Sequence, residues 1–433
     1  MDAGTRATDH YARALPHWRF WLRAQFLELV RDETAVLAHI QRRVRSPLLD
    51  QYFALSANIG THTFYMIMLP VFFWYGDFRM GIQVVLVLAL GVFTTGCIKD
   101  LLCLPRPRSP PLHRISMSAS AKLEYGMPST HSCNAVSVAL VFHQFDPQSR
   151  LVAGTSIWLL ATLVAGRVYT GMHGFLDIAV GCTFGVLSYW LSLLVLRVFD
   201  YSSVADNAAL TLLFVIGISL SPNPADDCPC FDDSVAFIGV VLGMMWTLAF
   251  TPSPVPFAAK FVHASLGPGA LAARALARFV VGVLFVVVWR DVSKRVLLRV
   301  LPPVWRVLDR LGLRNPRRFF LPSPAKLLPP AAVADQILDG SPCDFVHTLQ
   351  GPPHDSVGPQ SAADLYEARQ AEARQAEARE AGAPTATAPT ATAGIEQPRK
   401  HYDFEVFMRL IVYGGIGPMA LYCAKTAFSY LDV

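Results

Sequence analysis

The sequence predicts an all-α protein, a polytopic membrane helix bundle of about eight or nine spans. Hydrophobic residues make up 53% of its 433 residues and charged residues only 16%, whereas a soluble domain carries about 25% charged residues. The mean hydropathy is +0.38, so we expect membrane lipids as partners. The net charge of +5 lies mostly in arginine-rich flanks, which is typical of membrane orientation and gives no reason to expect nucleic acid binding.

The candidate spans are segments of about 20 mainly apolar residues, the length that a helix needs to cross a bilayer. Two of them, 132–145 and 208–222, are short and would be tilted, re-entrant or longer than their apolar stretch. The full set lies near 52–75, 81–98, 132–145, 152–169, 174–198, 208–222, 234–252, 276–290 and 405–427.

The order of these segments divides the chain into five parts. In the N-terminal part, residues 18–30 alternate Trp, Phe and Leu with arginines, which fits either a helix at the membrane interface or a solvated helix packed on the bundle. In the fourth part, the repeat EARQAEARQAEAREAG and the run TATAPTATAG (within 340–400) indicate a disordered or loosely helical insert without chemistry. The parts are a basic amphipathic arm (1–50), a membrane core with the candidate site (51–200), additional spans with an acidic Cys-Pro-Cys loop (201–290), a basic and then low-complexity insert (291–404), and the last span with the C-terminus (405–433).

Polar side chains gather at the ends of neighbouring spans, and ionisable groups are functional candidates there because they are costly in a membrane. If the spans alternate in direction, these ends lie on one side and can converge on one pocket. Each residue alone has a simpler explanation, such as a basic anchor at the interface or an Asp at a helix N-terminus. Together, they indicate a site formed by Lys99, Arg106, Ser129, Thr130, His131, Arg167, His173 and Asp177.

The cations of this set match the oxygens of a phosphate group. Lys99, Arg106 and Arg167 supply fixed positive charge, and the arginines can make bidentate contacts. Backbone N–H groups from Ser129 to His131 lie at an expected helix start, where the amides and the helix dipole favour an anion. Because lysine and arginine supply the charge that Mg²⁺ otherwise provides, we expect no metal and no cofactor.

The two histidines supply the groups for covalent catalysis. His173 and Asp177 are four residues apart, so on a helix they share a face, and the carboxylate can hold one ring nitrogen while the other attacks phosphorus. His131 is placed to protonate the departing alkoxide. The set predicts phosphomonoester hydrolysis through a phosphohistidine. A multispan transporter is the non-enzyme alternative, but it would not need this spacing, and internal repeats of its hydrophobic segments are not evident.

In order and spacing, these residues resemble the three-part signature of the type-2 phosphatidic acid phosphatase superfamily, which includes metal-independent lipid phosphatases. The matching motifs are Lys99-x6-Arg106-Pro107, Pro128-Ser129-Thr130-His131 and Arg167-x5-His173-x3-Asp177. The resemblance implies a phosphatidic-acid-phosphatase-type catalytic core. In it, His173 is the nucleophile, Asp177 orients it and His131 is the general acid. The implied phosphate ligands are Lys99, Arg106, Ser129, Thr130 and Arg167.

Further stretches resemble the branch that dephosphorylates sphingosine 1-phosphate and other long-chain-base 1-phosphates. They include GTHTFY (60–65), KDLLCLPRPRSPP (99–111), YTGMHGFLD (169–177) and CPCFDDSVAF (228–237). Thr130 replaces the usual glycine of the middle motif, a variant associated with this branch, and Gly166 stands where a serine commonly precedes the arginine. Phosphatidate or a polyprenyl diphosphate is the alternative substrate.

The Asp-Asp-Cys-Pro-Cys-Phe-Asp-Asp loop at 226–233 does not match a zinc site, because one residue separates its thiols and no histidine is near. We interpret it as an acidic loop, at most a lid in which Asp226 and Asp227 would attract the protonated amine of a sphingoid base. The chain's eight cysteines are scattered, which argues against a disulfide framework.

The resemblance implies a multi-pass protein of the endoplasmic reticulum membrane with a lumenal active site. Counting spans places the arm, the catalytic loops and the insert on one side, which is rich in Lys and Arg and would be cytosolic by the positive-inside rule. Either an extra N-terminal segment enters the membrane, or the catalytic arginines inflate the count, or the site faces the cytosol. Because long segments contribute little to the rule, the lumenal side is the expectation. The sequence leaves the lipid chain length and the oligomeric state open.

Overall fold

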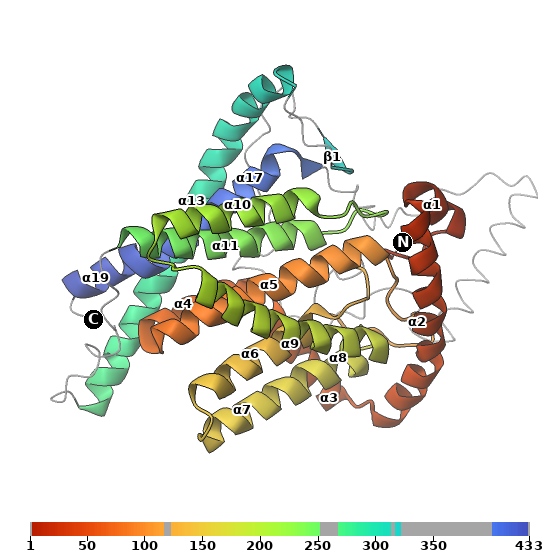
Figure 1. Cartoon of the computed structure of the whole chain (residues 1–433). Coiled ribbons are helices and arrows are strands. Elements are labelled where there is room, and N and C mark those ends of the chain that lie inside the picture. Colours follow the sequence, from red (N-terminus) through yellow and green to blue (C-terminus); the bar gives the residue numbers. More distant parts are fainter. Residues whose placement is uncertain (1, 117–122, 252–266, 313–316, 322–400, 432–433) are drawn as a thin grey trace, which may run out of the picture.

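The computed structural model describes residues 2–116, 123–251, 267–312, 317–321 and 401–431, which form a helix bundle with one pair of short strands (Figure 1). The all-α prediction is confirmed. In this part of the chain, six helical segments are long and apolar enough to cross a membrane: Phe78–Leu102, Arg150–Tyr169, Phe175–Val198, Cys230–Phe250, Pro268–Arg310 and Phe404–Tyr430.

Three predicted spans correspond to shorter helices. The number of helices that are long and apolar enough to cross a membrane is therefore lower than the predicted eight or nine. The segment 52–75 is broken, because α3 (Pro47–Ser56) ends in a 3₁₀ turn, η1 (Ala57–Gly60), before α4 (His62–Tyr75) begins. The other two are α6 (Thr130–Phe145) and α10 (Val204–Leu220).

The central helix of the bundle is α5 (Phe78–Leu102). It begins after Asp77, whose carboxylate accepts hydrogen bonds from the N–H groups of Arg79 (2.7 Å) and Met80 (3.1 Å), as a helix N-cap does. Leu86, Val87, Leu88 and Ala89 are fully buried, because α5 packs against α6, α9 and α11 on different sides. A helix enclosed in this way holds the residues at its C-terminal end, including Lys99, in a fixed position.

The helices of the candidate site surround this end of α5. After α6, a segment made of α7 (Arg150–Leu160), the π-helical turn η3 (Ala161–Ala165) and α8 (Gly166–Tyr169) leads to α9 (Phe175–Val198). α9 approaches the start of α6 closely at Gly181, where a Cβ atom would lie 2.5 Å from the carbonyl oxygen of Ser129. Small residues permit such close packing between membrane helices, and here they bring the ends of α6 and α9 together.

The C-terminal helices cover the other side of α5. They are α11 (Cys230–Phe250), the 43-residue α13 (Pro268–Arg310), which runs obliquely across the bundle, and α17 (Phe404–Gly414), α18 (Ile416–Pro418), η4 (Met419–Cys423) and α19 (Ala424–Tyr430) (Figure 1). Strands β1 (Phe320–Leu321) and β2 (His401–Tyr402) pair in parallel. The predicted low-complexity insert at 340–400 lies outside the described residues.

The N-terminal arm packs on the bundle, which is one of the two arrangements expected for it. α1 (Thr8–Ala14) and α2 (His17–Val44) lie across the end of the bundle where α5 ends (Figure 1). Arg19 and Arg23 face inward and donate hydrogen bonds to carbonyl oxygens at the end of α5, including those of Leu101 and Cys103. The outward face of α2 is mixed: Trp18 and Trp21 are 58% and 60% exposed, and charged side chains such as Glu28 and Asp32 are exposed as well.

Candidate active site

Two of the predicted phosphate ligands, Lys99 and Arg106, meet at one carboxylate. Oε2 of Glu124 accepts hydrogen bonds from Lys99 Nζ (3.2 Å) and from Arg106 Nη2 (3.0 Å). Burial alone would raise the pKa of the Glu124 carboxyl, but the charges of Lys99 and Arg106 outweigh it and lower this pKa to about 2. The cluster therefore holds two buried cations and one ionised carboxylate at neutral pH.

The predicted nucleophile, His173, lies beside Arg106 in the turn before α9. Arg106 Nη1 is 3.0 Å from His173 Nε2, and because a guanidinium can only donate, Nε2 is the unprotonated nitrogen of this ring. Burial and the nearby cations Arg106, Lys99 and Arg167 hold the pKa of His173 well below its ordinary value. The imidazole is therefore neutral at pH 7, as a nucleophile must be.

Asp177 lies near the other ring nitrogen, although the pair does not share a helical face as the spacing suggested. α9 begins at Phe175 after the N-cap Gly174, so His173 precedes the helix. Asp177 Oδ2 accepts a hydrogen bond from the N–H of Gly174 (2.9 Å) and lies 3.5 Å from His173 Nδ1. Asp177 thus fixes the turn that carries His173 and faces the nitrogen that bears the proton.

The second histidine, His131, lies at the start of α6 against the break between α3 and α4. At Gly60, a Cβ atom would overlap the imidazole ring of His131, so the absence of a side chain at this position makes room for the ring. His131 interacts electrostatically with Arg167, Glu124, Lys99 and Arg106. It therefore belongs to the same charged cluster as the predicted nucleophile.

The remaining predicted phosphate ligands are placed less directly. Arg167 is 5% exposed, and its Nε has no hydrogen-bond partner among the described residues. Ser129 is the N-cap of α6, and its hydroxyl accepts hydrogen bonds from Ser132. The hydroxyl of Thr130 lies 3.1 Å from that of Thr95 on α5. Both hydroxyls thus have contacts within the fold, and their contact with a phosphate stays a prediction.

Gly166, the position where a serine was expected, packs against α3. A Cβ atom there would lie 2.9 Å from Cδ1 of Phe53. The aromatic ring of Phe53 thus occupies the space that a serine side chain would need beside Arg167.

Sequence reasoning missed two carboxylates at the site, Glu124 and Glu33. Glu124 precedes the middle motif but carries no signal that separates it from other acidic residues. Glu33 comes from the arm: its Oε1 accepts a hydrogen bond from the N–H of Leu176 (2.9 Å), and the N–H of Phe175 also donates to this carboxylate. Glu33 therefore satisfies the first N–H groups of α9, which a helix cannot satisfy by itself.

Removing this contact is expected to lower turnover. In Glu33→Ala, two N–H groups at the start of α9 lose their acceptor, so the turn with His173 and Asp177 loosens, and we expect kcat to fall roughly tenfold. KM should change little, because the predicted phosphate ligands are untouched. Glu33→Gln keeps an acceptor oxygen and should restore most of kcat, and the exposed neighbour Asp32→Ala is the control. A Gln variant as impaired as the Ala variant would contradict this role.

The acidic loop at 226–233 is built into the fold, and attraction of a substrate amine by Asp226 and Asp227 stays a prediction. The carboxylate of Asp226 accepts hydrogen bonds from the N–H of Gly4 (2.9 Å) and the hydroxyls of Tyr11 (2.8 Å) and Tyr125 (3.2 Å). It also pairs with Arg6 at 3.1 Å. Asp226 is 5% exposed, and these contacts fasten the arm to the loop.

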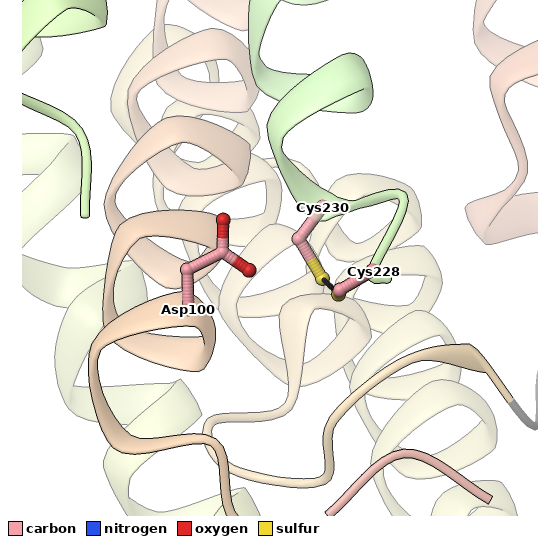
Figure 2. A group of neighbouring side chains, drawn as sticks. All are labelled: Asp100, Cys228 and Cys230. Carbon is pink, nitrogen blue, oxygen red and sulfur yellow. Dashed lines mark hydrogen bonds between the residues drawn. The ribbon is translucent and has the colours of Figure 1, made fainter. Parts of the chain in front are cut away.

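The two cysteines of this loop face Asp100, the neighbour of Lys99 (Figure 2). The potential ligand atoms of Asp100, Cys228 and Cys230 lie within 4.8 Å of one another, a proximity that sequence reasoning missed. Cys228 donates a hydrogen bond to Cys230 (2.7 Å), and Arg317 lies 4.0 Å from Asp100. A hydrogen-bonded thiol pair beside the cations Lys99 and Arg317 fits a metal ion poorly, and the absence of a metal from the site stays a prediction.

An apolar cavity begins next to the break that holds His131. It has a volume of about 40 Å³ and lies between α4, α11 and the segment from α17 to η4. Tyr65, in the first turn of α4 after Gly60, lines one end, and Phe73 lies two turns further along. Val240 and Ile416 line the opposite wall.

Comparisons with known proteins relate the chain to lipid phosphate phosphatases. Residues 81–200 match the family model described as the PAP2 superfamily. The chain is 35% identical over 315 residues to a dihydrosphingosine 1-phosphate phosphatase of Schizosaccharomyces pombe, which covers 69% of this chain and 75% of the relative. A dihydrosphingosine 1-phosphate phosphatase of Saccharomyces cerevisiae is 35% identical over 307 residues, 68% of this chain and 74% of the relative. Sphingosine-1-phosphate phosphatase 2 of Homo sapiens is 28% identical over 296 residues, 65% and 74% of the two chains. No solved structure matches the chain.

Proposed function

The chain belongs to the PAP2 superfamily and is a lipid phosphate phosphatase, and from this premise we propose that it releases phosphate from sphingosine 1-phosphate or a related long-chain-base 1-phosphate. One observation carries the chemistry. Arg106 lies 3.0 Å from the unprotonated Nε2 of His173, and it shares the carboxylate of Glu124 with Lys99. A nucleophile and two phosphate-binding cations therefore meet at one point. The names of the two yeast relatives support the substrate class.

The proposed reaction has two steps. His173 Nε2 attacks phosphorus, the bond between phosphorus and the lipid oxygen breaks, and His131 gives its proton to the departing alkoxide. Water then attacks the phosphohistidine, His131 takes up a proton, and inorganic phosphate leaves. Lys99, Arg106 and Arg167 stabilise the charge that develops on the phosphoryl oxygens. The reaction needs no metal, because these cations occupy the role that Mg²⁺ has in other phosphatases.

Phosphate release from sphingosine 1-phosphate and from phosphatidate, measured side by side with purified protein in EDTA, tests this function. We expect release from the sphingoid lipid in preference to phosphatidate, unaffected by EDTA. Equal release from both lipids would leave the family assignment in place and refute the proposed substrate preference. Loss of activity in EDTA would refute the metal-free reaction.

The apolar cavity provides a place for the hydrocarbon chain of the substrate. Its lining is apolar, and its Tyr65 end lies next to the break that positions His131. Binding energy from such a remote part of a substrate contributes to catalysis at the reacting group. The C-terminal helices, which lie beyond residues 81–200, would then contribute to substrate selection.

Filling the cavity is expected to discriminate against long chains. In Val240→Phe, the added ring occupies space between α4 and α11, so KM for a long-chain-base phosphate should rise roughly tenfold, while a water-soluble phosphate monoester should be hydrolysed as before. Ser219→Ala, on the exposed face of α10, is the control. Equal loss on both substrates would contradict this placement of the chain.

We place the protein in the endoplasmic reticulum membrane, with eight or nine spans and a lumenal site. The positive-inside count opposes this side, but many of the basic residues that enter it are buried in the structure, among them Arg19, Arg23, Lys99, Arg106 and Arg167. These side chains have partners or charged neighbours within the protein. Their presence is therefore explained by the site and the contacts that support it, and it is weak evidence that this side faces the cytosol. The short helices α4, α6 and α10 would complete the set of spans.

A further inference from the structure

We propose that Glu124 recognises the ammonium group of a 2-amino-alkyl phosphate and thereby selects long-chain-base phosphates over lipid phosphates without an amine. This inference rests on the proposed function, which assigns Lys99 and Arg106 to the phosphate. It concerns a residue outside the predicted catalytic set, and it assigns to Glu124 the amine-binding role considered for Asp226 and Asp227.

Glu124 lies on the open side of the phosphate-binding cations. Both ion pairs use the same oxygen, Oε2, so Oε1 takes part in neither. The side chain of Glu124 is 30% exposed, whereas those of Lys99 and Arg106 are 4% and 5% exposed. Arg106 Nε also donates to the backbone oxygen of Glu124 (3.3 Å), which holds this residue against the cations.

The charge of Glu124 has a consequence for any phosphate that binds here. Its carboxyl is ionised at neutral pH, because the neighbouring cations outweigh burial. A phosphate that contacts Lys99 and Arg106 therefore approaches a second anion within a few ångströms, and like charges at this distance repel. A positive group placed between the phosphate and the carboxylate would turn this repulsion into attraction.

A long-chain-base 1-phosphate carries such a group. Its ammonium is on the carbon next to the one that bears the phosphate, so it cannot move far from the phosphate oxygens. Phosphatidate and N-acylated bases carry no positive charge at this position. Glu124 thus distinguishes these lipids by charge, and a charge-assisted hydrogen bond to an ammonium is among the stronger polar contacts.

Other carboxylates near the site have different contacts. Asp226 is bound to the arm, Glu33 accepts from the start of α9, and Asp232 pairs with Arg409 at 2.8 Å. Among the described residues, Glu124 is the carboxylate that contacts both Lys99 and Arg106. The alternative role for it is that of a counter-ion that neutralises these cations whatever the substrate.

The variant Glu124→Gln separates the two roles. We would measure kcat/KM for sphingosine 1-phosphate and for its N-acetyl derivative, which keeps the phosphate and the chain but lacks the charge. Recognition of the ammonium predicts that the variant loses roughly 10–100-fold on the amine-bearing lipid and is unchanged or faster on the N-acetyl lipid. Glu124→Asp keeps the charge and should keep the preference for the amine.

Two controls make the result decisive. Glu28→Gln, the same change at an exposed position of α2, should behave as the unmodified protein. A water-soluble phosphate monoester without an amine reports whether the site is intact. Equal loss on both lipids, or an unmodified enzyme without preference for the amine, would overturn the role of Glu124 and leave the phosphatase activity in place. No hydrolysis of any phosphate by the unmodified protein would overturn the proposed function and this inference with it.

Discussion

Replacing His173 with alanine is expected to abolish phosphate release, with kcat lower by roughly 10⁴-fold or more. His173 is the buried, neutral imidazole whose Nε2 faces Arg106, a predicted phosphate ligand, at 3.0 Å. Without it, the site keeps its cations and can bind the lipid phosphate, but it has no group that can form the covalent intermediate. Phosphate release from sphingosine 1-phosphate measures the effect.

The exposed His39→Ala on α2 is the matched control for this variant, and we expect its turnover to equal that of the unmodified protein. Removing His173 leaves a small cavity beside Arg106, so thermal unfolding should be compared in parallel. An alanine variant that folds normally and still releases phosphate at more than a few per cent of the original rate would show that another group attacks phosphorus.

Gly60→Ala is expected to lower kcat for lipid substrates by roughly 10²-fold, the contribution of a general acid. A Cβ atom at this position overlaps the imidazole ring of His131, so the ring must move away from the leaving oxygen. The effect should be small for para-nitrophenyl phosphate, whose leaving group departs without a proton. The ratio of the two losses measures how far the general acid is displaced.

Gly154→Ala is the control for this substitution, because a Cβ atom at Gly154 meets nothing within 4 Å. The break between α3 and α4 must be intact for the comparison, which the helix content of the variant reports. If Gly60→Ala impaired the aryl and lipid substrates equally, the damage would lie in binding or in the nucleophile, and His131 would lose its role as acid.

The predicted site residues were accessible from the sequence because their spacing carries information. A cation at the end of a span, a helix start with Ser129 as N-cap and a histidine four residues before an aspartate are local patterns, and the alternation of spans brings them to one side. The local reading was inexact where a helix begins: α9 starts after His173, so the His173–Asp177 contact depends on a turn.

The supports of the site could not be predicted, because they join distant segments without a periodic signal. Glu33 and Leu176 are 143 residues apart, and Gly4 and Asp226 are 222 apart. Arg19 and Arg23 suggested a solvated face of the arm, yet they point inward to the carbonyl groups that end α5. Such arginines can be buried because the last carbonyl groups of α5 have no hydrogen-bond donor within the helix. The sequence of the arm does not reveal these acceptors.

The most direct test of the proposed reaction is chemical quenching of the purified protein during turnover of sphingosine 1-phosphate in EDTA, followed by mass spectrometry under conditions that preserve phosphohistidine. We expect a phosphoryl group on His173, formed without metal and absent when His173 is replaced by alanine. A phosphoryl group on another residue, or turnover that requires a divalent metal and never labels His173, would contradict it.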